Sequence, residues 1–262
     1  MSAGPAGSTP LLRVERLTVR FGGVTALDSV SFEVEPGHVC GLIGPNGAGK
    51  TTLFDCVSRL THPQRGRIGF EGRDLLALEA HEVAALGIAR TFQHLGLFGS
   101  LSVRENVMLG GQHARRAGLT AAALRLPLVG REERALRRRA DQVLERLGLA
   151  HLAARPAAGL PYGTLKRIEL ARALGAAPKL LLLDEPASGL SHGEVDELAE
   201  VISAIRGDGD LTVLLVEHHM GMVMRMCDKV VVLDFGSKIA EGAPAAVRED
   251  PAVIQAYLGV PA

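Results

Sequence analysis

Apolar and polar residues alternate from residue 11 to residue 37, where β-branched side chains are frequent. This period of two predicts antiparallel strands, with breaks at Gly22, Gly23, Pro36 and Gly37. A short apolar run follows at 39–44 and ends in glycines, which predicts a strand entering a loop. Further patterns predict a helix over 50–59, a strand over 66–75, a helix over 79–86 and a strand over 89–92.

Between about residue 100 and residue 175 the spacing of apolar residues is mainly helical. Ser102 and Glu105 form a capping-box pattern at the start of this stretch. A second helix is predicted by the apolar positions Leu136, Ala140, Val143, Leu144 and Leu147. The arginines between 131 and 139 are interpreted as a solvated helix face, because opposite charges lie at helical spacing beside them.

Continuous apolar runs at 180–183, 211–216 and 230–233 are typical of parallel strands buried on both faces. The fold class predicted is therefore α/β, with an antiparallel β part at the start and an inserted helical part at about 100–175. Residues 11–262 are expected to form a single domain. Residues 1–10 are expected to be a disordered tail.

The strongest motif matches GxxxxGK[ST] and is preceded by a predicted strand and followed by a predicted helix. In such a P-loop the backbone N–H groups and the helix N-terminus surround phosphates, so a nucleoside triphosphate is the expected ligand. Lys50 is expected on the β- and γ-phosphates, and the Thr51 hydroxyl on Mg²⁺. The motif consists of Gly44, Pro45, Asn46, Gly47, Ala48, Gly49, Lys50 and Thr51.

A second site is predicted at Asp184 and Glu185, which directly follow the apolar run 180–183. Two adjacent carboxylates at the end of a strand suit phosphate hydrolysis. Asp184 would orient Mg²⁺, and Glu185 would act as general base toward water.

Phe21 follows the first predicted strand and allows two interpretations, stacking on adenine or packing in the core. The guanine-reading NKxD motif is absent, which favours ATP over GTP.

Composition narrows the function classes further. The 29 basic and 29 acidic residues balance, so no nucleic-acid partner is needed to explain the charge.

The three cysteines are far apart and match neither a disulfide framework nor a zinc site. No apolar run approaches the roughly 20 residues of a membrane span, and the N-terminal residues lack the pattern of a signal peptide.

With these motifs in this order, the chain resembles the ABC ATPase family over nearly its whole length. The matching segments are GPNGAGKTT at 44–52 (the P-loop, which adds Thr52), ARTFQ at 89–93 (the Q-loop), LPYGT at 160–164 (the signature), LLLLDEP at 180–186 (Walker B), ASGLS at 187–191 (the D-loop) and VEHH at 216–219 (the switch). The resemblance implies a RecA-like core with an antiparallel β subdomain and a helical subdomain.

The resemblance also implies roles for individual residues. Gln93 would contact Mg²⁺ and water, His218 would sense the γ-phosphate, and Phe21 would be the aromatic residue beside adenine. The signature residues would bind the nucleotide of a partner subunit; they are Leu160, Pro161, Tyr162, Gly163 and Thr164. A metal site at His218 and His219 is disfavoured, because adjacent helix positions face different ways and no HExxH pattern is present.

Two segments depart from the family pattern. The signature has Pro161 where serine is usual and Thr164 where glutamine is usual, which removes one expected hydroxyl from the phosphate contacts. The D-loop ends in Ser191 where aspartate is commoner, which weakens a carboxylate role across a dimer.

A closer resemblance, over 87–110, 160–174 and 230–259, is to the ATP-binding subunits of branched-chain amino-acid importers. It implies a homo- or heterodimer with a second ABC ATPase, two membrane permease subunits and, indirectly, a solute-binding protein. It also implies a peripheral position at the cytoplasmic face of the cell membrane. Two alternatives stay open: an ABC ATPase of another transport system (lipopolysaccharide export, or amide or urea uptake) and a soluble ABC ATPase outside transport.

Overall fold

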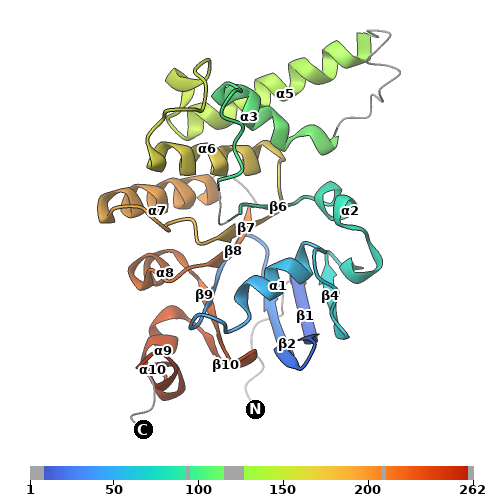
Figure 1. Cartoon of the computed structure of the whole chain (residues 1–262), viewed down its shortest axis with the longest axis vertical. Helices are drawn as coiled ribbons and strands as arrows, with labels where there is room; N and C mark the ends of the chain where they lie inside the picture. The colour runs from blue at the N-terminus through green and yellow to red at the C-terminus, as the bar shows by residue number, and fades with distance from the viewer. Residues whose placement is uncertain (1–8, 93–94, 115–126, 208–210, 259–262) are drawn as a thin grey trace.

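The computed structural model describes residues 9–92, 95–114, 127–207 and 211–258. Within them the chain forms two sheets (Figure 1). The larger sheet has the strand order β10-β9-β3-β8-β7-β6, and all its pairs are parallel except the antiparallel pair β9 and β10. Its strands are β3 (Val39–Ile43), β6 (Ile88–Arg90), β7 (Leu180–Asp184), β8 (Thr212–Val216), β9 (Lys229–Asp234) and β10 (Ser237–Gly242).

Both faces of this sheet are buried, as the continuous apolar runs predict. Side chains alternate between two cores along each strand. Leu181 and Leu183 of β7 belong to one core, which includes α6 and α7. Leu180 and Leu182 belong to the other, which includes α1 and the smaller sheet. The parallel sheet is therefore the layer that holds the two halves of the molecule together.

The smaller sheet has the order β2-β1-β4-β5 and is antiparallel. Its strands are β1 (Leu12–Phe21), β2 (Val24–Val34), β4 (Arg65–Phe70) and β5 (Arg73–Asp74). The single strand predicted over 66–75 is wrong: the chain reverses at Glu71 and Gly72, whose φ angles are 48° and 77°, so that β4 and β5 form a hairpin. The 3₁₀ turn Leu75–Ala77 follows it.

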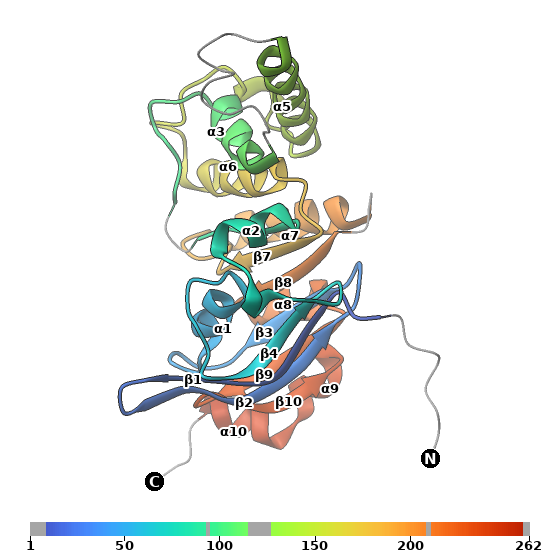
Figure 2. The ribbon, with the colours of Figure 1, turned by 90° about the vertical axis from the view of Figure 1, so that its right-hand side faces the viewer.

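Helices α3, α5 and α6 pack together at one end of the molecule, above β7 in both ribbon views (Figures 1 and 2). Helix α1 lies between the two sheets. Helices α7, α8, α9 and α10 contribute to the core on the other face of the larger sheet, whereas Val83 of α2 belongs to the same core as α1. The α-helix bounds are α1 (Lys50–Val57), α2 (Ala80–Ala85), α3 (Val103–Gly110), α5 (Pro127–Arg146), α6 (Tyr162–Gly175), α7 (His192–Gly207), α8 (Met220–Met226), α9 (Pro244–Glu249) and α10 (Pro251–Leu258). Short 3₁₀ helices span Gln112–Ala114 and Ala150–Leu152.

The predicted capping box of α3 is confirmed, because the Ser102 side chain accepts from the backbone N–H of Glu105 and the Glu105 carboxylate accepts from that of Ser102. Helix α6 begins at Tyr162, within the segment that resembles the signature. The fold class is confirmed. The division into a tail and one domain stays a prediction, and only Thr9 and Pro10 of the predicted tail lie within the described residues.

Strand β8 lies between β3 and β7, and the three strands are parallel. Their carboxyl ends therefore meet at one edge of the sheet, where ligands of open α/β sheets bind. The P-loop follows β3, Asp184 ends β7, and Glu217 and His218 follow β8. The topology alone brings three separate motifs to one place.

Two further observations concern membrane-spanning helices and the cysteines. In the described ranges, no helix combines the length and the apolar character that a membrane crossing demands. Cys40, Cys56 and Cys227 are free and buried, and burial raises the pKa of each thiol to about 12.

Close packing of α3 on α6 yields a first prediction. A Cβ added at Gly110, the last residue of α3, would lie 1.8 Å from the carbonyl oxygen of Arg172 on α6. Gly110→Ala should lower the free energy of unfolding by about 1–3 kcal/mol, because the backbones must separate. The matched control is Gly130→Ala on α5, where a Cβ meets nothing within 4 Å. The control should raise the stability by about 0.5–1 kcal/mol. Urea unfolding measures both, and equal stability of the two variants would refute the packing argument.

Candidate nucleotide site

The P-loop lies between the end of β3 and the start of α1. Gly49 is the N-cap of α1 with φ 101°, and a Cβ there would lie 2.5 Å from the carbonyl oxygen of Ala26 on β2. Glycine is thus required both by the backbone conformation and by the close approach of β2. No side chain caps α1, so its first N–H groups are available to an anion.

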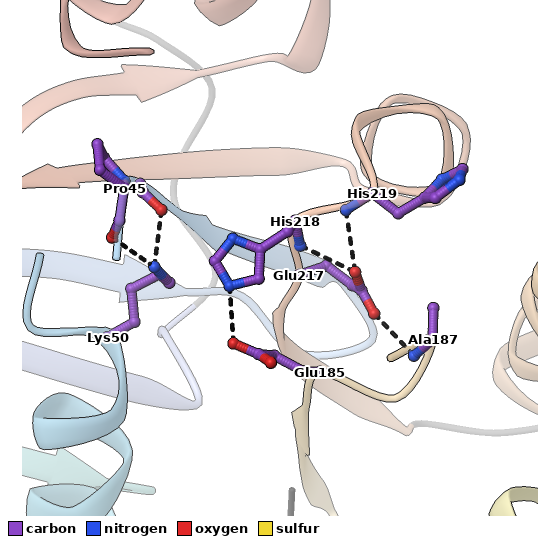
Figure 3. A network of polar contacts seen from close by, with 8 residues as sticks. Pro45, Lys50, Glu185, Ala187, Glu217, His218 and His219 are labelled. Carbon is purple, nitrogen blue, oxygen red and sulfur yellow. Dashed lines mark hydrogen bonds and ion pairs between the residues drawn. The ribbon is translucent and has the colours of Figure 1, made fainter. Parts of the chain in front are cut away.

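Lys50, the first residue of α1, is 6% exposed, and its ammonium group points back into the loop (Figure 3). Its Nζ donates to the carbonyl oxygens of Gly44 at 2.7 Å and Pro45 at 2.8 Å. Burial lowers the pKa of Lys50, and the nearby carboxylates of Glu185 and Asp184 oppose that shift. The loop therefore holds a buried cation at its centre, where a phosphate would compensate its charge.

Asp184 ends β7 and is 4% exposed. Burial raises the pKa of its carboxyl group, and the hydrogen bond and charge of Arg90 act in the opposite direction. Glu185 follows with φ 47°, a left-handed conformation that is uncommon for a residue with a side chain. Strained backbone of this kind is concentrated at functional sites.

The structure brings Glu185 and His218 together, as Figure 3 shows. Nε2 of His218 lies 2.7 Å from Oε1 of Glu185. His219 is turned away from Glu185 in the same view and packs edge-on against the ring of His192 at 5.6 Å. The described residues contain no group of three His, Cys, Asp or Glu side chains that could hold a metal ion by themselves.

Glu217 is a residue that sequence reasoning missed. It is 3% exposed and accepts three backbone N–H groups: those of His218 (2.8 Å), His219 (3.0 Å) and Ala187 (2.8 Å). The first two belong to the segment after β8, and the third belongs to the predicted D-loop after β7. Glu217 thus fixes the two segments relative to each other. The available signal was its position, an acid directly after a buried strand, as Asp184 is.

Arg90 at the end of β6 was also missed as an individual residue. Its guanidinium bonds Asp184 (2.9 Å) and Asp55 (2.7 Å). Thr91 contributes as well, since its Oγ1 accepts the backbone N–H of Asp184 at 3.2 Å. Two consecutive residues, the last of β6 and the one after it, therefore hold Asp184.

Phe21 ends β1 and is 53% exposed, so the alternative of a core phenylalanine is wrong. It pairs with Val24 at the tip of the β1–β2 hairpin, and the same hairpin contacts Gly49 through Ala26. An exposed aromatic ring is thus carried by the hairpin that lies against the P-loop. Its stacking on adenine stays a prediction.

Among the other predicted residues, Thr51 is exposed on the first turn of α1 beside half-buried Thr52. Gln93 lies outside the described residues. The segment 160–164 is not brought to the P-loop of the same chain: α6 and α1 lie on opposite sides of β7 in both ribbon views. Pro161 is the N-cap of α6 without a side-chain cap bond. Tyr162 instead reaches the D-loop, with its hydroxyl 3.4 Å from the carbonyl oxygen of Ser188.

The arrangement fits a nucleoside triphosphate with Mg²⁺. The glycine loop, the uncapped helix and Lys50 form a phosphate cradle. The expected metal ligands, Thr51 and Asp184, offer the hard oxygen atoms that Mg²⁺ prefers, and phosphate oxygens usually complete its coordination.

Comparisons with known proteins agree with this geometry. The family profile described as "ABC transporter" matches residues 27–188, and that described as "Branched-chain amino acid ATP-binding cassette transporter" matches residues 237–262. The chain is similar to the high-affinity branched-chain amino acid transport ATP-binding protein LivG of Salmonella typhimurium, with 41% identity over 252 residues, 96% of this chain and 99% of the relative. Against BraF of Pseudomonas aeruginosa, which has the same description, identity is 40% with the same coverage.

Among solved structures, an ATP-binding cassette of an ABC transporter in its ADP conformation superposes with a TM-score of 0.83 at 32% identity. The superposition covers 97% of this chain and 100% of that cassette. Sequence and structure lead to the same conclusion: the chain belongs to the ABC transporter family, as an ATP-binding subunit with ATPase activity.

Proposed function

We propose that this chain hydrolyses ATP with Mg²⁺ to drive an importer of branched-chain amino acids. The observation that carries the proposal is the meeting of Lys50, Glu185 and His218 at one edge of the sheet. The solute is inferred from likeness to relatives, because an ATPase subunit of this kind does not itself touch the solute.

In the proposed mechanism, the P-loop N–H groups and Lys50 bind the β- and γ-phosphates. Thr51 and Asp184 would hold Mg²⁺, with Gln93 as the predicted third contact, and the ion would neutralise phosphate charge. Glu185 takes the proton of the attacking water as general base. His218 keeps the Glu185 carboxylate oriented through their 2.7 Å contact and senses the γ-phosphate.

The signature segment needs a nucleotide from elsewhere, because it lies apart from the P-loop of its own chain. We therefore infer a dimer with a second ABC ATPase, identical or related, in which residues 160–164 bind the partner's nucleotide. The N–H groups of Gly163 and Thr164 lie in the first turn of α6 and have no side-chain cap, so they are available to phosphate.

Permease subunits are the proposed membrane partners, with a solute-binding protein acting through them, and the position is the cytoplasmic face of the membrane. Phe98 is 55% exposed, so packing in the core does not explain why an aromatic residue occupies this position. Its loop is nevertheless rigidly held, since fully buried Asn106 accepts the N–H of Phe98 (2.8 Å) and donates to its carbonyl oxygen (3.0 Å). A fixed, exposed aromatic ring suits docking to a permease helix.

Glu185→Gln tests the proposed function. The variant should lose about 10²–10⁴-fold in ATP turnover, because the general base is removed. ATP binding should persist since the phosphate cradle is intact, and ATP-dependent leucine uptake by the assembled transporter should stop. The matched control is Glu249→Gln, an exposed acid at the end of α9. Turnover close to wild type in Glu185→Gln would contradict the role of Glu185 as general base. If the assembled transporter takes up no branched-chain amino acid, the proposed class of solute is wrong.

Pro161→Ser tests the signature. Proline cannot donate a hydrogen bond, whereas a serine hydroxyl could add one to a charged phosphate, worth about 1.5–3 kcal/mol. The loss of proline stiffness costs about 0.5–1 kcal/mol, so ATP-driven dimerisation should strengthen. Sedimentation in a Glu185→Gln background measures the dimer constant, with Pro161→Ser compared to Pro251→Ser at the start of α10. An unchanged or weaker dimer constant would mean that the backbone already binds phosphate fully.

Phe98→Ala tests the docking ring. Uptake by the assembled transporter should fall severalfold more than the ATPase rate of the isolated subunit, because a hot-spot aromatic contributes about 2 kcal/mol or more to an interface. Leu128→Ala, an exposed apolar residue on α5, is the control and should alter neither rate. An equal loss of both activities in Phe98→Ala, with a lower melting temperature, would favour a purely structural role.

A further inference from the structure

Arg90 has an unusual environment for a charged residue. It is the last residue of β6, next to β7, and its side chain is 9% exposed. Nη1 donates to Oδ1 of Asp55 on α1 at 2.7 Å, and Nη2 donates to Oδ2 of Asp184 at 2.9 Å. The guanidinium also lies over the rings of Phe54 at 5.6 Å and Phe92 at 5.4 Å. Two carboxylates and two aromatic rings therefore fix its plane.

Stability alone does not account for this arrangement. The cost of desolvating a buried ion pair offsets most of its attraction, so apolar residues of similar size commonly do as well. Nε of Arg90 is moreover buried without a hydrogen-bond partner in the described part of the chain, which adds a further cost. A buried polar group that is incompletely satisfied requires a reason other than packing.

The contact with Asp184 supplies that reason. The bond from Arg90 goes to Oδ2 of this carboxylate, so it does not use Oδ1. One guanidinium shared between two carboxylates also leaves the group with a net negative charge, which still attracts a cation. Because the carboxylate at the end of β7 is held on one oxygen and at its backbone N–H, its orientation is set before any ligand binds.

We propose that Arg90 is a positioning residue that orients Asp184 for the Mg²⁺–ATP complex. The proposal rests on the proposed role of Asp184 as a metal ligand. Loss of a partner that orients a metal ligand from behind typically lowers the metal affinity by about 10–100-fold. Arg90 does not touch substrate in this scheme; it acts through Asp184.

The same guanidinium extends to the surface. Arg90 and Phe92 line a groove of about 290 Å³ between α2 and α6, and Phe92 is 46% exposed. Phe54, the other ring beside the guanidinium, is fully buried.

The test is the affinity of Mn²⁺, used in place of Mg²⁺, for the subunit bound to a non-hydrolysable ATP analogue, measured by electron paramagnetic resonance. Arg90→Gln should weaken Mn²⁺ binding by about 10–100-fold. Binding of the analogue in EDTA should stay at the wild-type value, because the phosphate cradle is untouched. Arg90→Lys should bind Mn²⁺ severalfold more weakly than wild type, because the compact ammonium group of lysine cannot bridge two carboxylates as a guanidinium does.

The matched control is Arg104→Gln, which breaks an Arg–Asp pair with Asp141 in the helical part and should leave Mn²⁺ affinity unchanged. Mn²⁺ affinity equal to or tighter than wild type in Arg90→Gln would overturn the proposal. If that variant does not fold, Arg90→Lys decides by the same criterion. A wild-type subunit that binds no Mn²⁺ with the analogue would instead overturn the proposed function.

Discussion

The parallel pairing of β8 between β3 and β7 is the constraint on which the site depends. Each strand is apolar on both faces, so it is stable only when covered on both sides. The two cores supply that cover from opposite sides. Once the pairing is fixed, the loops after the three strands have no freedom to lie elsewhere, and the P-loop, Glu185 and His218 become neighbours.

The same constraint explains how so many charged groups are buried at this edge. Each is compensated by a backbone group or by an opposite charge. Lys50 donates to two carbonyl oxygens, Glu217 accepts three N–H groups, and Asp184 faces Arg90. In a poorly screened interior these bonds are strong and directional, so they fix side chains that would be mobile at the surface. The rigidity that a phosphate-transfer site requires thus comes from satisfying the charges that the site contains.

Much of this could be predicted from the sequence, and the successes have local causes. The P-loop can be recognised in the sequence because its backbone conformation requires glycine at positions such as Gly49. The buried strands can be recognised because a run such as 180–183 is apolar throughout. Arg90 and Glu217 could not be assigned this way, because their roles depend on partners 94 and 30 residues away. The β4–β5 hairpin was missed because Glu71, with φ 48°, adopts a conformation that its residue type does not indicate.

Glu217 also determines how events at the nucleotide would reach the rest of the chain. Its carboxylate ties the backbone of His218 to that of Ala187, at the start of the D-loop. The next residue, Ser188, accepts the hydroxyl of Tyr162, the first residue of α6. The proposed γ-phosphate sensor is therefore connected through consecutive hydrogen bonds to the segment proposed to face a partner's nucleotide. The first two bonds of this series are 2.8 Å long, whereas the last is exposed and 3.4 Å long. A displacement of His218 would therefore be transmitted to the D-loop more directly than to the start of α6.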